Sequence, residues 1–232
     1  MKEIAIDEAR ELVGSAALWP RVRDFLWDFL PQVHASWLDD LEWREALDAG
    51  DEAGPSHDAA DLMSSPRVRR FVLDSLGVAP CFHAFPKEDG SRLALLDGAT
   101  LLALAQWLGA LACAEDLRKV TDGATVRALK AALPGVYPEV FGYTAYFKGL
   151  ASKDEKTATT ADEIQACGFE ILASAVSDVP APVAARLKFK LPKRLGEHSG
   201  LRGGEGSFPR AFPTVLKLLK LKFPEAHALC CS

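Results

Sequence analysis

Apolar residues recur every three or four positions along most of this chain, which is the spacing of one face of an α-helix. Alternation of apolar and polar residues, the signal of a half-buried strand, does not recur. The helical spacing covers residues 7–19, 20–30, 34–47, 66–76, 98–114, 123–133, 137–150, 161–175 and 208–223. The pattern therefore predicts an all-α fold, with residues 1–195 as a single compact multi-helix domain.

Residues that start helices mark several of these boundaries. Ser, Thr and Asp side chains accept hydrogen bonds from the unpaired amides of a first turn, and Pro fits the first helical position. The signals are Ser36 and Asp97 as N-caps, Pro66 and Pro138 at helix starts, a break and restart at Thr121–Gly123, and a capping box of Thr160 with Glu163. They predict short connections between the helices.

Aromatic residues are expected on two buried faces. In the helix that begins at Pro66, the spacing places Phe71 on the apolar face with Val68 and Val72. Residues 137–150, YPEVFGYTAYFKGL, are predicted to form one aromatic-rich helix.

The most apolar segment is residues 98–114, GATLLALAQWLGALACA, which carries no charge. A membrane-spanning helix needs about 20 predominantly apolar residues. This segment is shorter, has Gln106 near its middle, and is flanked at once by Asp97 and Glu115. We therefore expect it to be the most buried helix of a helical bundle, and we expect no direct membrane span.

The C-terminal part of the chain has a different composition. Residues 196–207 are rich in glycine and read as a linker, and residues 208–232 contain a basic amphipathic helix and a tail. Such a helix can lie on an anionic membrane, dock in a partner's groove, or pack onto its own domain. The sequence leaves these three alternatives open.

Composition and cysteine usage bound the class of protein. The chain has 232 residues, of which 49% are hydrophobic and 25% charged, so wholesale disorder is excluded. Its five cysteines are odd in number and form no CxxC pair, a pattern typical of reduced thiols in an intracellular protein. The beginning, MKEIAIDEAREL, lacks the apolar core of a secretory signal. We expect a cytoplasmic protein.

Charge is distributed unevenly along the chain. Residues 1–185 hold 17 basic and 29 acidic residues, whereas residues 186–232 hold 10 basic and 3 acidic ones. Nine of the acidic residues fall within residues 39–61. Two hypotheses fit this asymmetry: the two regions meet different partners, or the basic region folds back onto the acidic one.

Sequence motifs for catalysis and cofactor binding are absent. The chain has no GxxxxGK[ST] loop, GxGxxG, HExxH or GxSxG motif, and its histidines have no metal-ligand spacing. We predict no catalytic residue, no cofactor and no metal site, with an unrecognised site around Cys81, His83 and the helix that contains Tyr137 and Tyr146 as the enzymatic alternative. The acidic balance also argues against nucleic-acid binding. These observations favour an interaction protein.

Three segments together resemble one family. They are His34-Ala35-Ser36-Trp37-Leu38, the stretch 93–134 with its Asp97-Gly98 step and its break at Asp122, and RLKFKLP at residues 186–192. In this order, over about residues 30–192, they resemble the type III secretion sorting-platform adaptors, the SctK/YscK group with MxiK and OrgA as distant members. The resemblance does not include the sequence after residue 195, where the glycine-rich stretch and the basic helix follow.

The resemblance implies a non-enzymatic cytoplasmic adaptor at the inner-membrane base of an injectisome in a Gram-negative bacterium. Members of the family link the cytoplasmic domain of the inner-membrane ring protein (SctD) to the pod protein (SctQ). The alternative hypothesis is a peripheral membrane protein anchored by the basic helix at residues 208–223.

Candidate residues divide into two groups. The oppositely charged segments are the predicted partner contacts, because complementary charge steers association. These contacts are Asp39, Asp40, Glu42, Glu45, Lys188, Lys190, Lys193 and Arg194. The motif residues are predicted to build the fold instead, and these are His34, Trp37, Leu38, Asp97, Gly98 and Asp122.

Overall fold

The computed structural model describes residues 10, 13, 15–39, 65–78, 82–88, 90–147, 150, 160–198, 208 and 211–231. Every regular element in these residues is a helix, so the predicted all-α fold is confirmed. The α-helices are α2 (Trp19–Trp27), α3 (Ala35–Leu38), α6 (Pro66–Ser75), α7 (Gly98–Ala112), α8 (Ala114–Lys119), α9 (Gly123–Ala132), α10 (Ala161–Ala175), α11 (Ala181–Phe189), α12 (Lys193–His198), α13 (Ala211–Lys222) and α14 (Pro224–Cys231). The 3-10 helices are η1 (Leu30–Gln32), η2 (Ser91–Leu95), η3 (Glu139–Gly142) and η4 (Thr144–Phe147).

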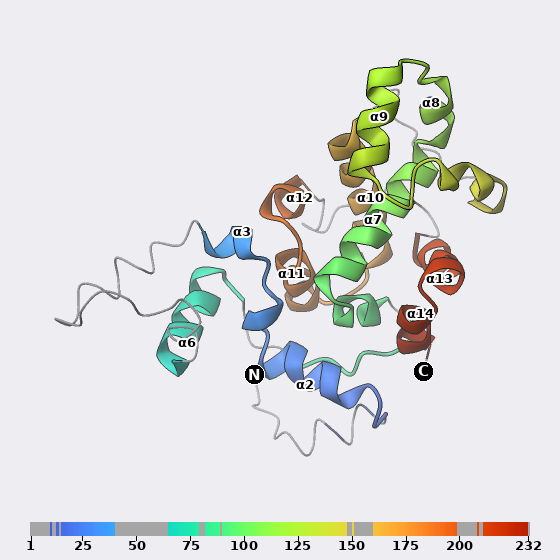
Figure 1. Cartoon of the computed structure of the whole chain (residues 1–232). Helices are drawn as coiled ribbons and strands as arrows, with labels where there is room; N and C mark the ends of the chain where they lie inside the picture. Colours follow the sequence, from blue (N-terminus) through green and yellow to red (C-terminus); the bar gives the residue numbers. More distant parts are fainter. Residues whose placement is uncertain are drawn as a thin grey trace.

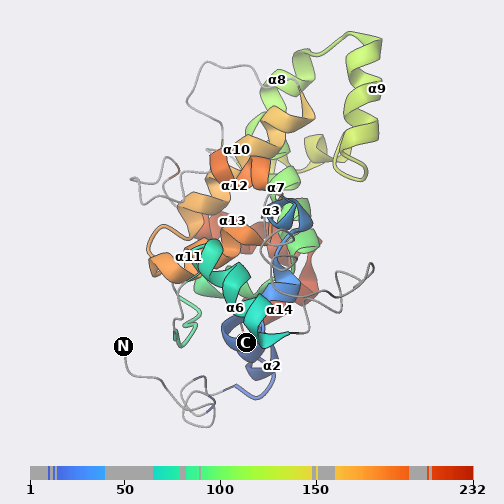
Figure 2. The same ribbon diagram turned by 90° about the vertical axis from the view of Figure 1, so that its left-hand side faces the viewer.

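Helices α7 and α10 lie side by side through the middle of the molecule (Figures 1 and 2). The hairpin of α8 and α9 projects at one end of this pair, and α2 lies at the other end (Figure 1). Helices α3 and α6 flank one side, whereas α13 and α14 flank the opposite side (Figure 1). The central pair contacts α8, α12, α13 and η3 directly, whereas α2, α11 and α14 pack on η2.

Two glycines allow α7 and α10 to approach each other closely. A Cβ atom at Gly109 would lie 1.8 Å from the carbonyl oxygen of Ile164, and one at Gly168 would lie 1.8 Å from that of Ala105. The neighbours that block these positions are backbone atoms, which cannot rotate away as a side chain can. The apolar segment predicted to be the most buried helix is α7, and its residues from Trp107 to Ala112 are all buried.

The predicted helix starts are largely confirmed. Asp97 caps α7, with the Thr100 amide donating to its carboxylate at 2.7 Å, and Asp122 caps α9 in the same way at 2.7 Å. Thr160 and Glu163 form both hydrogen bonds of the capping box, and Pro66 is the first residue of α6. Two predictions are wrong: the N-cap of α3 is His34 rather than Ser36, and Pro138 precedes the 3-10 helix η3 instead of starting an α-helix.

Two expectations about aromatic segments are wrong. Residues 137–150 form the short η3 and η4 instead of one α-helix. The Thr144 hydroxyl donates to the Phe141 carbonyl oxygen at 3.1 Å, and such a side-chain bond competes with an α-helical one. Phe71 is 47% exposed, although Val68 and Val72 of the same helix are buried as expected.

The C-terminal helices pack onto the domain itself. Val215, Leu218 and Leu219 of α13 are completely buried, and α13 contacts both α10 and α7. In this arrangement the apolar face of α13 lies in the core, which corresponds to the alternative that the basic helix packs onto its own domain. Helix α12 extends to His198, into the region predicted as a linker, and residues 199–207 of that region lie outside the described residues.

Among the described residues, no helix is both long enough and apolar enough to cross a membrane.

Candidate functional site

The three motif segments meet at one place, which we call the motif junction: residues 34–38, 97–98 and 186–193. The backbone amide of His34 donates to the Phe189 carbonyl oxygen at 2.8 Å. The amide of Lys193 in turn donates to the Ser36 hydroxyl oxygen at 2.9 Å. These bonds attach α3 to the end of α11, which lies more than 150 residues later in the chain.

Trp37 is the anchor of the motif junction. Its side chain is buried, and its indole Nε1 donates to the Leu191 carbonyl oxygen at 2.8 Å. Its ring meets the ring of Phe189 edge to face, with centroids 4.9 Å apart. The Lys188 ammonium lies 5.0 Å from the Trp37 ring centroid, within the range of a cation–π contact. The side chain of Trp37 is thus held by contacts within the fold.

The Asp97-Gly98 step contacts the same segment from the other side. A Cβ atom at Gly98 would lie 2.5 Å from the Lys190 carbonyl oxygen, so only glycine fits there without a shift of the backbone. Partial burial acts to raise the pKa of Asp97, but hydrogen bonds from the Thr100 amide and hydroxyl hold that pKa below its usual value. The cap is therefore ionised at neutral pH and favours the first turn of α7.

Within the motif junction, Lys190 lies in the core. It is only 2% exposed, and its Nζ donates to the carbonyl oxygens of Ala94 at 2.6 Å and Leu96 at 2.9 Å. The ring of Phe25 covers it, with the centroid 5.1 Å from Nζ. Burial lowers the pKa of Lys190 to about 7, against the opposing attraction of Asp97. Lys190 is therefore a fold residue, and its predicted role as a partner contact is wrong because a partner cannot reach it.

This lowered pKa predicts a pH dependence of stability. Above pH 7 the folded chain releases the Lys190 proton, whereas the unfolded chain keeps it up to about pH 10.5. The free energy of unfolding should therefore rise with pH in this window, by at most about 1.4 kcal/mol per pH unit. We expect Lys190→Met to flatten this part of the profile, as measured by urea unfolding between about pH 7 and 9.5. Lys188→Met is the control, and parallel profiles for Lys190→Met and the wild type would contradict the assignment.

Arg186 is a second buried cation at the motif junction. Its guanidinium Nη1 donates to the carbonyl oxygens of Phe25 and Leu26, near the C-terminal end of α2. The guanidinium carbon also lies 5.5 Å and 5.3 Å from the ring centroids of Phe25 and Phe29. A cation is favoured at a helix C-terminus because the last carbonyl groups are not paired within the helix. The conspicuous basic residues 186 and 190 thus hold α2, η2 and α11 together.

The other predicted contact residues that the structure describes lie within the motif junction or directly beside it. Asp39 is exposed directly after α3, Lys188 and Lys193 are partly exposed, and Arg194 is exposed. The Arg194 guanidinium pairs with the Asp162 carboxylate at 2.7 Å. Asp40, Glu42 and Glu45 lie outside the described residues. Asp39 and the basic residues therefore occupy neighbouring positions around α3, not two separate ends of the molecule.

Of the predicted motif residues, His34 and Leu38 belong to the motif junction and Asp122 does not. The His34 imidazole Nδ1 accepts from the Ser36 amide at 3.2 Å, and Leu38 packs against the core. Asp122 is exposed at the start of α9, in the projecting hairpin (Figure 1). Hydrogen bonds from the Thr125 amide and hydroxyl lower the pKa of Asp122, in keeping with a capping role.

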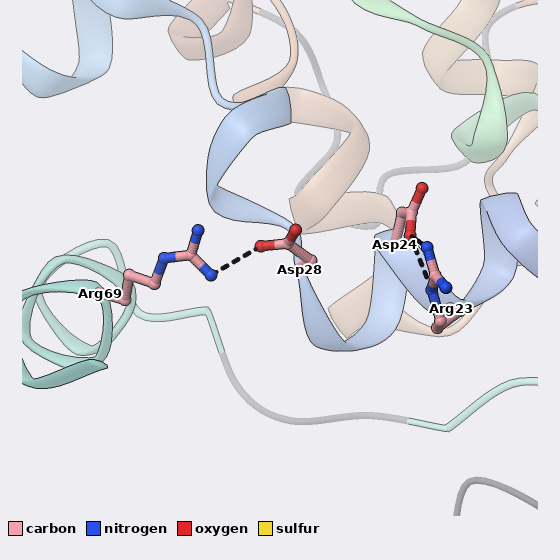
Figure 3. Close-up of polar contacts among 4 residues, drawn as sticks. All are labelled: Arg23, Asp24, Asp28 and Arg69. Carbon is pink, nitrogen blue, oxygen red and sulfur yellow. Dashed lines mark hydrogen bonds and ion pairs between the residues drawn. The ribbon is translucent and has the colours of Figure 1, made fainter. Parts of the chain in front are cut away.

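Two exposed aromatic residues near α2 and α6 were not predicted as surface residues. Trp27 is 42% exposed and Phe71 is 47% exposed. Arg69 of α6 pairs with Asp28 at the end of α2 at 2.9 Å, whereas Arg23 pairs with its own neighbour Asp24 (Figure 3). Trp27 falls outside the helical series of buried residues Val22, Phe25 and Phe29, and that spacing could have identified it.

The sequence also suggested an alternative enzymatic site around Cys81 and His83. Cys81 lies outside the described residues, and the His83 ring packs edge to face on Phe85 with centroids 5.2 Å apart. The part of the chain that the structure describes contains no group of three or more His, Cys, Asp or Glu side chains placed to hold a metal ion.

Comparison with models of protein families gives a match over most of the chain. A family model described as YOP proteins translocation protein K (YscK) matches residues 26–200. No curated protein and no solved structure matches the chain significantly. The matched residues include all three segments of the motif junction and confirm the resemblance drawn from them. Helices α13 and α14 lie beyond the match.

Proposed function

Because the chain belongs to the YscK family of type III secretion proteins, we propose that it is a non-enzymatic adaptor of the injectisome sorting platform. In this role it links the cytoplasmic domain of an SctD-like inner-membrane ring protein to an SctQ-like pod protein. It acts in the cytoplasm, at the inner-membrane face of the secretion apparatus.

The family match carries this proposal, because it covers most of the chain and includes every segment of the motif junction. The geometry supports a binding role in a second way. Three buried donor atoms of the motif junction are engaged by other protein groups: Lys190 Nζ and Arg186 Nη1 donate to carbonyl oxygens, and Trp37 Nε1 donates to the Leu191 carbonyl oxygen. The junction thus acts as a rigid support for the charged side chains around it.

We assign one partner contact to the charged surface around α3. It consists of Asp39 with Lys188, Lys193 and Arg194, which are the predicted contacts that remain once the buried Lys190 is removed and the set is limited to described residues. Both signs of charge lie close together there, so the surface suits a partner patch that is also mixed in charge. Rim charges of this kind mainly set the rate of association and its salt dependence.

Charge reversal tests this surface. We expect the triple variant Lys188→Glu, Lys193→Glu and Arg194→Glu to weaken binding to one of the two partners by about tenfold, because attraction becomes repulsion at three positions. The loss should shrink as the salt concentration rises. Binding of the purified variant to each partner domain, measured by calorimetry at two salt concentrations, provides the test.

Arg127→Glu with Lys130→Glu on the exposed side of α9 is the matched control and should leave both affinities unchanged. The thermal midpoint of each variant shows whether the fold is intact. If the triple variant is folded and binds both partners as well as the wild type does, the charged surface around α3 is not a partner contact.

A further inference from the structure

Helix α13 lies in a groove formed by other parts of the domain. Val215, Leu218 and Leu219 are completely buried against the core, and the helix contacts α10 and α7. The opposite side carries Lys220, which is exposed. The helix is therefore seated as an amphipathic helix sits in a recognition groove.

The end of this helix places a lysine in an aromatic cage. The Lys222 ammonium lies 4.2 Å from the ring centroid of Trp107 and 4.2 Å from that of Tyr143. It also forms an ion pair with the Glu139 carboxylate at 2.5 Å. Two aromatic faces and one carboxylate around an ammonium group are the chemistry of a cation-binding site. The Lys222 side chain is only 15% exposed, so this cation–π contact is largely shielded from water.

Partial burial acts to lower the pKa of Lys222, but hydrogen bonds to the side chains of Glu139 and Tyr143 raise it above its ordinary value. The cage therefore favours a charged occupant.

A second lysine of α13 also contacts the family part of the chain. Lys217 donates to the Tyr146 carbonyl oxygen at 2.7 Å, and its ammonium lies 5.4 Å from the Phe147 ring centroid.

The family match includes the residues of the cage but not the helix that fills it. Trp107, Glu139 and Tyr143 all lie within the matched residues 26–200, whereas the whole of α13 lies beyond them. The family part of the chain thus builds the cage, and the extension supplies the lysine that fills it.

We infer that the groove on α7, α10 and η3 is a docking site for a lysine-bearing amphipathic helix of a partner protein, and that α13 occupies this site in cis. The partner helix has the chemistry of α13: an apolar face of three aliphatic residues, followed at its end by a lysine for the Trp107–Tyr143 cage. Release of α13 opens the site. This inference goes beyond the proposed adaptor role and does not depend on the identity of the secretion partners.

A synthetic peptide of residues 208–232 is the probe, because it carries the chemistry of the partner helix. It is added, with a fluorescent label and under reducing conditions, to the purified full-length chain. In the full-length Lys222→Glu variant, the cage repels the variant's own α13, and the groove becomes free for the peptide. We therefore expect this variant to bind the peptide at least about tenfold more tightly than the wild type does. A peptide that itself carries Lys222→Glu should lose that gain.

Lys220→Glu is the matched control, since it changes the same charge on the exposed side of the same helix. We expect it to bind the peptide as weakly as the wild type does. Equal binding by Lys220→Glu and Lys222→Glu, or no peptide binding by a folded Lys222→Glu chain, would overturn the inference.

Hydrogen exchange on the wild-type chain gives a readout that does not depend on any variant folding. A helix that leaves its groove while the core stays folded exchanges its amides through local opening. We expect the amides of α13 to exchange at least about tenfold faster than those of α7 and α10. Exchange of α13 at the rate of α7 and α10 would show that it is an inseparable part of the core, and would overturn the inference.

Discussion

Trp37→Ala is expected to lower the free energy of unfolding by about 3–5 kcal/mol, the usual cost of removing a large buried aromatic side chain. The substitution removes the edge-to-face contact with Phe189 and leaves the Leu191 carbonyl oxygen without the indole donor. Both losses weaken the attachment of α3 to the end of α11. Urea unfolding followed by circular dichroism measures the effect.

Two other tryptophan variants give this prediction its controls. Trp37→Phe keeps a ring but not the donor, so we expect a smaller cost of about 1–3 kcal/mol. Trp27→Ala removes a tryptophan that is 42% exposed and should cost about 1 kcal/mol or less. A similar cost for Trp27→Ala and Trp37→Ala would mean that the motif junction is not the anchor we describe.

Gly168→Ala is expected to destabilise the chain by about 3 kcal/mol or more, at the upper end of the cost of overpacking. The added methyl group would lie 1.8 Å from the Ala105 carbonyl oxygen and 2.8 Å from the Gly109 amide nitrogen. Since both neighbours are backbone atoms, α7 and α10 have to move apart, and the core loses contacts along their length. The free energy of unfolding from urea titration is the measurement.

Gly142→Ala is the matched control, because no atom lies within 4 Å of the position of its added Cβ. We expect it to change stability by no more than about 0.5 kcal/mol. A cost of less than about 1 kcal/mol for Gly168→Ala would contradict the close approach of α7 and α10.

Local signals in the sequence predicted the elements well. The carboxylate of Asp97, the Thr160–Glu163 capping box and the first-turn position of Pro66 each act within one helical turn, and the structure contains all three. The apolar stretch that became α7 was also identified, because its composition differs from that of every other segment. These features depend on neighbours in the sequence and can be read from it directly.

Features that depend on distant parts of the chain could not be predicted in this way. Lys190 resembled a surface charge, yet carbonyl oxygens of Ala94 and Leu96 and the ring of Phe25 surround it. Phe71 has the spacing of a buried residue, yet no other element of the described part of the chain buries it. The cage around Lys222 likewise joins three segments whose proximity no local pattern reveals.

The distribution of charge illustrates the same limit of local reasoning. The acidic and basic regions suggested either two separate contact surfaces or one region folded onto the other. The structure places Asp39 next to the basic segment, because the Ser36 and Trp37 side chains bond to the backbone of residues 191–193. For the described residues, neighbouring opposite charges around α3 are therefore the better basis for a binding surface.

Reconstitution of the bridge between the two partners tests the adaptor role most directly. The purified chain is mixed with the cytoplasmic domain of the SctD-like ring protein and the SctQ-like pod protein of the same organism, and the masses of the complexes are measured by light scattering after gel filtration. We predict one complex that contains all three proteins and that the two partners do not form without this chain. If the chain binds neither partner, or if the partners associate equally well without it, the adaptor function is contradicted.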